Sequence, residues 1–144
     1  MRILRTPSKI RTNRKTITFT GGAGAGLAGS PITVFTVTGQ IYIHGITAFC
    51  TTLLTESGAT ATVSLGTTNQ VSRFVSSTNS VDIDANEWWV TTTPTVGSID
   101  LPDALQSVLV SENIIINPLV TNTTAGVLEI VLVWEPISQN GSVS

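Results

Sequence analysis

The sequence predicts an all-β protein: a single jelly-roll-like sandwich or barrel, preceded by an extended basic N-terminal arm. Short runs rich in Val, Ile, Thr and aromatic residues recur along the chain, and clusters of Gly, Asn, Ser and Pro separate them. Only one stretch, residues 102–109, has helical character, and it is long enough for one or two turns at most. Many short strands between regular turn signals are typical of sandwiches and barrels.

The chain divides into four predicted regions. Residues 1–20 form the basic arm, whose first fifteen residues have no periodicity and which we expect to be disordered alone and ordered on a partner. Residues 21–31, rich in Gly, Ala and Ser, form a hinge. The β body covers residues 32–137, and residues 138–144 form a flexible tail.

Strands are expected wherever β-branched residues concentrate or alternate with polar ones. The arm ends in a short β run at 16–20. The runs 32–38 and 41–49 are joined by Gly39-Gln40 and form a plausible hairpin, because glycine supplies the positive φ that tight turns need. In the body the predicted strands are 32–38, 41–49, 59–66, 71–75, 87–92, 107–111, 113–117 and 127–134.

Composition indicates a protein that is covered by partners. The 144 residues suit one domain, charged residues make up only 11%, and the mean hydropathy is +0.32. Ordinary soluble domains carry about 25% charged residues. A body with so little charge has little to keep it apart from its neighbours.

Charge is distributed unevenly along the chain. Six of the seven basic residues lie in the first fifteen positions, and all nine acidic residues follow residue 55. The partner-binding arm residues are Arg2, Arg5, Lys9, Arg11, Arg14 and Lys15. A basic tail on an acidic body predicts that the tail binds something acidic. The chain contains no apolar stretch of about 18 residues, so no membrane span is predicted. No secretory signal is recognisable either.

The stretch GGAGAGLAGS contains the spacing G-x-G-x-x-G at Gly24, Gly26 and Gly29. A dinucleotide-binding turn needs a helix directly after these glycines and an acid about 20 residues later. Here Ser30-Pro31 and β-branched residues follow, and no acid occurs before Glu56. The stretch is interpreted as a joint, and no cofactor is predicted.

Other candidate sites are weak. The segment 82–87 begins like a calcium loop, but Glu87 stands where the loop needs glycine, so it is interpreted as an acidic turn and no metal site is predicted. His44, the single histidine, is flanked by strand residues, and Cys50, the single cysteine, is expected to be buried and inert. No set of acid, base and nucleophile can be assembled, so the sequence predicts no catalytic residues and no enzyme.

Trp88 and Trp89 are a candidate interface. Adjacent residues of a strand point to opposite faces, so one indole is expected in the core and the other outside. An outward tryptophan is either a partly covered surface residue or an interface anchor.

The basic arm has two functional interpretations besides that of a solvated tail. Lys and Arg bind phosphate backbones, and they also bind acidic protein surfaces, where an extended arm can wrap a neighbour or add a strand to its sheet. The first fifteen residues contain no aromatic side chain for stacking on bases, whereas Ile3, Leu4 and Ile10 are interleaved with the charges. This pattern favours a protein groove.

The body resembles small proteins encoded in the head-gene modules of tailed bacteriophages. The stretches that carry the resemblance are SPITVFTVTGQIYIHGITAFCTTLLTESGATATVSLGTT, VDIDANEWWVTTTPTV and VLEIVLVWEPIS, which together span about residues 30–138. The resemblance implies a capsid decoration, or cement, protein. Such proteins are β-rich, often trimeric, and lock major capsid subunits on the outer lattice with extended arms.

The leading hypothesis is therefore a non-enzymatic virion protein, made in the host cytoplasm, that binds the major capsid protein on the capsid surface and forms a homo-oligomer, with a trimer favoured. One alternative is a small jelly-roll coat protein whose basic arm contacts the packaged genome. Another is a receptor- or glycan-binding module of a tail or fibre, with Trp88 or Trp89 as the sugar platform. Nucleic acid is a partner only under the first alternative, and no membrane partner is expected.

Overall fold

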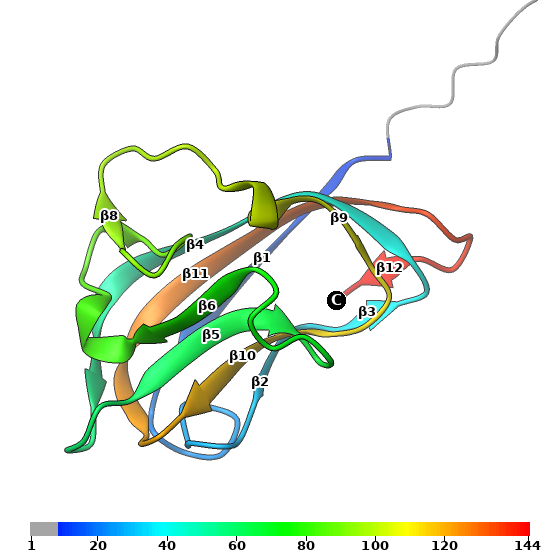
Figure 1. Cartoon of the computed structure of the whole chain (residues 1–144). Helices are drawn as coiled ribbons and strands as arrows, with labels where there is room; N and C mark the ends of the chain where they lie inside the picture. Colours follow the sequence, from blue (N-terminus) through cyan, green and yellow to red (C-terminus); the bar gives the residue numbers. More distant parts are fainter. Residues whose placement is uncertain (1–8) are drawn as a thin grey trace, which may run out of the picture.

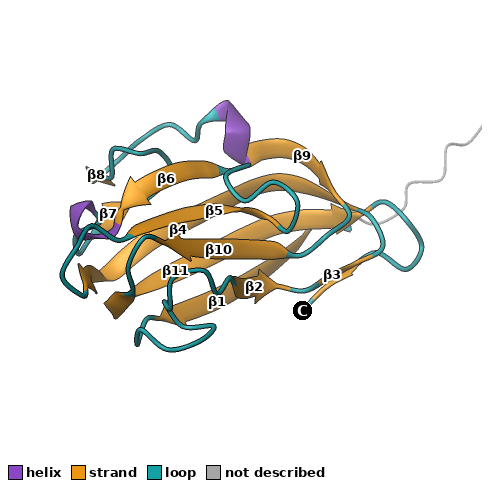
Figure 2. Cartoon of the chain, turned by 60° about the horizontal axis from the view of Figure 1, so that its bottom comes forward, coloured by secondary structure: helices purple, strands orange, loops and turns teal. Residues whose placement is uncertain are grey.

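The computed structural model describes residues 9–144 and confirms an all-β protein. Two antiparallel sheets face each other across one core, and a two-stranded ribbon closes one end (Figures 1 and 2). The strands are β1 (Arg11–Thr18), β2 (Ile32–Phe35), β3 (Val37–Thr38), β4 (Ile41–Glu56), β5 (Thr62–Thr67), β6 (Val75–Asn79), β7 (Glu87–Trp88), β8 (Thr95–Val96), β9 (Gln106–Val110), β10 (Ile114–Leu119), β11 (Thr123–Pro136) and β12 (Ser142–Val143). The structure also has two 3₁₀ turns, η1 (Ser80–Asp82) and η2 (Asp103–Leu105). Within residues 9–144 no helix is long and apolar enough to cross a membrane.

The large sheet is built around its two longest strands, β4 and β11, in the order β1-β11-β4-β7-β8. The far side of β4 is shared by two partners: β9 pairs with its first part, from Ile41 to Gly45, and β7 pairs with Phe49 and Cys50. β1 is an edge strand that pairs with β11 over its whole length, from Arg11 opposite Trp134 to Thr18 opposite Val127. This sheet presents one face to the core and one to the outside.

The small sheet has the order β2-β10-β5-β6. Val63 and Leu65 of β5 enter the core, as their alternation predicts. Ser64, which lies between them on the opposite face, is also buried, because the following loop folds back over it and the Ser64 hydroxyl donates to the Val71 carbonyl at 2.8 Å.

The core contains inward residues of both sheets. Leu128, Ile130 and Leu132 of β11 are fully buried, and so are Ile43 and Ile46 of β4. Buried polar side chains are paired: no buried side-chain nitrogen or oxygen among residues 9–144 lacks a hydrogen-bond partner. A core of this kind fixes the two sheets relative to each other.

Several predicted elements differ from the observed ones. The hairpin through Gly39-Gln40 is wrong, because 32–38 becomes β2 and β3, which pair with β10 and β12, while β4 pairs with β11 in the other sheet. The helical candidate at 102–109 is η2 followed directly by β9. In the segment predicted as a flexible tail, Ser142–Val143 pairs with Val37–Thr38. These differences arise from pairing between residues far apart in the sequence.

The Gly-rich segment is a folded loop rather than a free joint. Its backbone is held at Gly26, whose carbonyl accepts from Thr123 N at 2.9 Å, at Ala28, whose N–H donates to Asn122 Oδ1 at 3.0 Å, and at Gly29, whose N–H donates to Pro118 O at 2.8 Å. Gly26 has a φ of +117°, and a Cβ there would overlap the Thr123 carbonyl oxygen. The loop therefore carries the chain from the edge of one sheet to the edge of the other along a fixed path.

Candidate interaction surface

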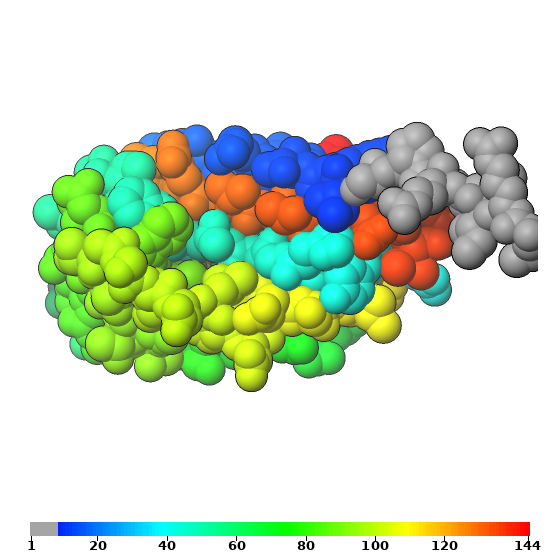
Figure 3. Space-filling model, turned by 90° about the horizontal axis from the view of Figure 1, so that it is seen from above, coloured from blue at the N-terminus to red at the C-terminus, as the bar shows by residue number. Residues whose placement is uncertain are grey.

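The outer face of the large sheet is the candidate functional surface. Figure 3 looks onto it, with β1, β11 and β4 as successive bands and the segment around residues 90–110 along the far side. Antiparallel partners share a face, so the register places Arg14 beside Val131 and Phe49 beside both Glu129 and Trp88 on this outer side. Half-buried apolar side chains thus continue across the middle of the face.

A shallow trough runs across this face from β1 toward the loop after β8. Its central part has a volume of about 400 Å³ and is lined by Arg14, Thr47, Phe49, Trp88, Glu129 and Val131. Two smaller hollows extend it, one over Lys15 and Thr16 of β1 and the other over Ile99 and Leu101. A trough with apolar walls and separate charges at its margin can bury a side chain of a partner.

Trp88 and Trp89 point to opposite faces, as the sequence predicts. Trp89 is completely buried, and its indole N–H donates to Thr78 Oγ1 at 3.0 Å. Trp88 is half-buried in the trough, where its ring packs edge-on against Phe49 with centroids 4.7 Å apart, and its N–H donates to Gly97 O at 2.9 Å. Of the two candidate interface residues, the structure leaves only Trp88 on the surface. Whether it contacts a partner stays a prediction.

The six basic residues of the predicted arm separate into two groups. Arg2 and Arg5 lie outside the described residues, and Lys9 precedes the first strand. The other three, Arg11, Arg14 and Lys15, are part of β1. The strand is locked at its start, where Asn13 Oδ1 accepts from Trp134 Nε1 at 2.8 Å. A stretch expected to be disordered alone is thus, from Arg11 onward, a paired edge strand.

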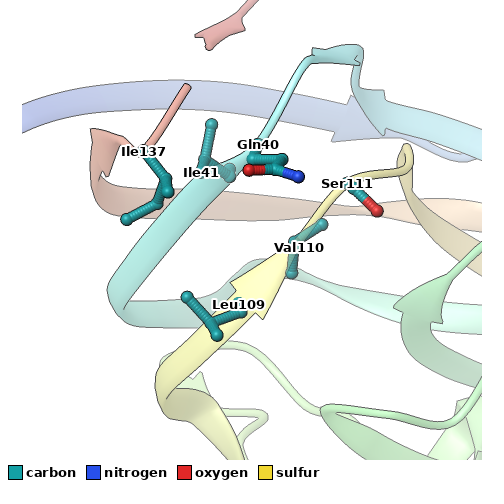
Figure 4. Close-up of a pocket in the computed structure, with 6 residues that line it drawn as sticks. All are labelled: Gln40, Ile41, Leu109, Val110, Ser111 and Ile137. Atoms are coloured by element: carbon teal, nitrogen blue, oxygen red, sulfur yellow. The ribbon is translucent and has the colours of Figure 1, made fainter. Parts of the chain in front are cut away.

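An apolar groove lies at the end of the molecule where β1 begins. It has a volume of about 230 Å³ and is lined by Gln40, Ile41, Leu109, Val110, Ser111 and Ile137 (Figure 4). Leu109 of β9 is 74% exposed, and Ile137, just after β11, is 54% exposed. Arg11 pairs with Trp134, three residues before Ile137, so the N-terminal residues enter the fold at this same end.

The weaker candidate sites have ordinary structural roles. His44 lies in β4, and its Nε2 is 2.9 Å from Glu135 Oε1, so its side chain has a hydrogen-bond partner. In the acidic turn, the Glu87 carboxylate accepts from Asp84 N at 2.6 Å, and no cluster of three metal-ligating side chains occurs within residues 9–144. Cys50 is buried, as expected. Burial, followed by the negative charges of Glu87 and Asp84, raises the pKa of the Cys50 thiol to about 11.

Sequence reasoning missed the residues that build the trough with Trp88. Phe49 and Val131 belong to predicted strands, and their half-buried outward positions follow from alternation alone. Their proximity to Arg14 does not, because it requires knowing that β1 pairs with β11 and β11 with β4.

The structure was compared with known proteins. No protein-family model matches the chain, and no curated protein sequence matches it. Among solved structures, a chain of the "Cyanophage Pam1 capsid asymmetric unit" is similar, with a TM-score of 0.52, 18% sequence identity and coverage of 93% of each chain. The two chains therefore have similar lengths, and the likeness extends over nearly all of both. At this identity it shows a shared fold.

Proposed function

We propose that this protein is a structural component of a phage capsid, which decorates the capsid surface, oligomerises there and tethers neighbouring subunits through its N-terminal segment. The observation that carries the proposal is the shared fold with a chain of a cyanophage capsid over 93% of both chains. That coverage includes nearly the whole of the other chain, so the likeness is not confined to one part of it.

The surface features support the same role. The end groove with Leu109 and Ile137 and the outer trough with Trp88 both offer apolar area to a partner. Lys9 and Ile10, which directly precede β1, lie at the same end of the molecule as this groove, because Arg11 pairs with Trp134. We propose that this end of the molecule faces the capsid subunits and that Arg2, Arg5 and Lys9 bind acidic side chains there, while Ile3 and Leu4 fill apolar gaps.

The test is a deletion of residues 1–8, which leaves β1 complete. The truncated chain should keep the circular dichroism spectrum and melting temperature of the full chain. It should bind capsids that lack this protein at least about tenfold more weakly in a co-sedimentation assay, because each removed contact contributed to the tether. A full-length R2Q/R5Q variant is the matched control: it keeps the length and the apolar residues and removes only charge.

Undiminished capsid binding by the deletion variant would contradict the tether. Failure of the full-length chain to bind capsids at all would contradict the decoration role. Another outcome is that the full-length chain binds DNA with a steep salt dependence and the deletion abolishes that binding. This result would replace the decoration role with that of a coat protein whose arm contacts the genome.

A further inference from the structure

Charge of opposite sign is segregated to the two long sides of the large sheet. β1 carries Arg11, Arg14 and Lys15 and no acidic residue. On the other side, residues 82–103 follow the far side of β4 through η1, β7, β8 and the start of η2. This acidic strip contains five acidic residues and no basic one: Asp82, Asp84, Glu87, Asp100 and Asp103. Figure 3 shows β1 and the later part of the strip on opposite sides of the face.

The two sides cannot neutralise each other within one chain. β11 and β4 lie between them, and strands are spaced about 4.8 Å apart, so the separation is roughly 15 Å. The Debye length at physiological salt is about 8 Å. Within residues 9–144 the only contact between a basic and an acidic side chain is that of His44 with Glu135, which involves neither side. Glu129 of β11 lines the same hollow as Arg14 and Lys15, but the three cations of β1 exceed this one acid, so each side keeps an excess of charge that can attract another molecule.

Both sides also expose apolar surface beside their charges. Ile10, at the start of β1, is 52% exposed, while Val96 and Ile99 of the acidic strip are 66% and 37% exposed. The trough joins the two sides, since Arg14 lines one part of it and Ile99 another. Each side thus combines charge of one sign with apolar area, which is the composition of a specific contact and not merely of a solvated edge.

We propose that the β1 side of one copy of this chain docks against the acidic strip of a second copy. This inference deepens the oligomerisation that belongs to the proposed function. The contact joins two different patches, so it is heterologous, and repeating it generates either a closed ring or an open filament. Arg14 of one copy, on the outer face of β1, meets Asp100 and Asp103 of the next. Lys15, which is opposite the buried Ile130, reaches the same strip from the other face of this edge strand. Ile10 meets Val96 and Ile99.

Charge and apolar contact dominate over strand pairing in this interface. Within residues 9–144 no strand pairs with the outer edge of β1, but β8, the outermost strand of the acidic strip, is only two residues long. Continuous sheet between β1 and the acidic strip therefore cannot extend far. Arg73 approaches one end of the acidic strip, where its guanidinium donates to Ala104 O at 3.2 Å, and the strip remains net negative.

The test is charge reversal of each side separately and then of both together. All four target side chains are exposed, so the variants R14E/K15E and D100K/D103K should keep the wild-type circular dichroism spectrum. By sedimentation equilibrium at low salt, each double variant should have a self-association constant at least about tenfold weaker than the full wild-type chain. The variant with all four substitutions restores opposite charges across the contact and should regain association.

Mixing the two double variants gives a further readout. At positions 14, 15, 100 and 103, where the contact is proposed, each variant carries charge of one sign only and repels its own copies. In the mixture, opposite charges meet at these positions and the two variants should associate in alternation. Wild-type association should also weaken as salt is raised toward 1 M, where the Debye length is about 3 Å.

Three outcomes would overturn the inference. One is a wild-type chain that stays monomeric at millimolar concentration and low salt; another is association that the reversals leave unchanged. The third is a monomer whose β1 side binds a short DNA duplex and loses that binding in R14E/K15E. None of these readouts uses capsids, so a chain that binds capsids but does not self-associate would refute this contact while leaving the decoration role intact.

Discussion

At the scale of single residues, neighbouring tryptophans have opposite roles. Trp89 fills the core between the sheets, with its indole N–H satisfied by Thr78, whereas Trp88 covers Phe49 on the outer face. Trp88 ends the two-residue strand β7, and Trp89 follows it directly, with its backbone N–H donating to Ala48 O at 2.8 Å. The alternation of a pleated strand nevertheless decides which indole is inside.

Substitution of the two tryptophans should therefore have unequal effects. Trp89→Ala removes a fully buried aromatic side chain and should lower the free energy of unfolding by about 3–5 kcal/mol. Trp88→Ala removes a half-buried one and should cost about 1–2 kcal/mol. Urea denaturation followed by circular dichroism measures both, and equal losses would contradict the assignment of faces.

Cys50 makes the stability of the protein depend on alkaline pH. Its pKa is raised from 9.0 to about 11 by burial, with smaller contributions from Glu87 and Asp84. The fold therefore favours the neutral thiol. The resulting stabilisation is fully present below pH 9, where the unfolded chain also holds the proton, and it is lost as the pH rises from about 9 to about 11.

Cys50→Ala should flatten this part of the pH dependence. Wild-type protein should lose up to about 2 kcal/mol more than the variant between pH 8 and pH 11. Comparing the two slopes in chemical denaturation at several pH values cancels the titration of Tyr and Lys. The thiol should also resist maleimide labelling at pH 8 in folded protein. Parallel slopes for the two proteins would show that the thiol ionises as freely in the fold as outside it.

At the scale of elements, the long strands owe their shape to irregularities. The pairing of β4 with β11 shifts register at four places. At one of them Gly126 has a φ of +115°, and a Cβ there would lie 2.7 Å from the Leu53 carbonyl oxygen. Bulges of this kind bend and twist a strand pair, which lets the large sheet curve over the small one (Figure 1).

The loop between β1 and β2 gives a matched pair of glycines for a test. Gly26→Ala combines a positive φ with overlap on the Thr123 carbonyl and should lower stability by at least about 2 kcal/mol. Gly24→Ala also has a positive φ, +67°, but no atom lies within 4 Å of its Cβ, so its cost should be only about 1 kcal/mol. Thermal unfolding of both variants compares them. A loop that serves merely as a free joint would tolerate both equally.

At the scale of the whole molecule, β1 contributes both to the stability of the large sheet and to the proposed contact between copies. It covers the edge of β11 along eight residue pairs, and it brings three cations onto one side of an otherwise acidic body. Charged residues on an exposed edge also discourage uncontrolled pairing between sheets. The same strand can therefore restrict non-specific association and direct a specific one.

Deleting residues 1–18 should consequently be far more damaging than deleting residues 1–8. The longer deletion exposes the backbone of β11 and removes Ile17, which packs against the core. We expect loss of the cooperative thermal transition, or aggregation, for that chain, and near-wild-type unfolding for the shorter deletion. A folded and soluble 19–144 chain would show that β1 is dispensable for the body.

The sequence by itself determined what is local. Alternation and β-propensity predicted an all-β chain and the split between Trp88 and Trp89. The same local signals predicted a buried Cys50, because its neighbours have the composition of a core strand.

Only the tertiary structure decided which strands pair and therefore which surfaces exist. Arg11, Arg14 and Lys15 looked like a tail because a strand with no apolar alternation owes its order to the hydrogen bonds of its neighbour β11. The trough and the two oppositely charged sides likewise combine residues that are far apart in the chain. Local pattern gives each residue a conformation and a face, but strand pairing is a contact between distant segments, and the free energy of those contacts selects the surface that partners meet.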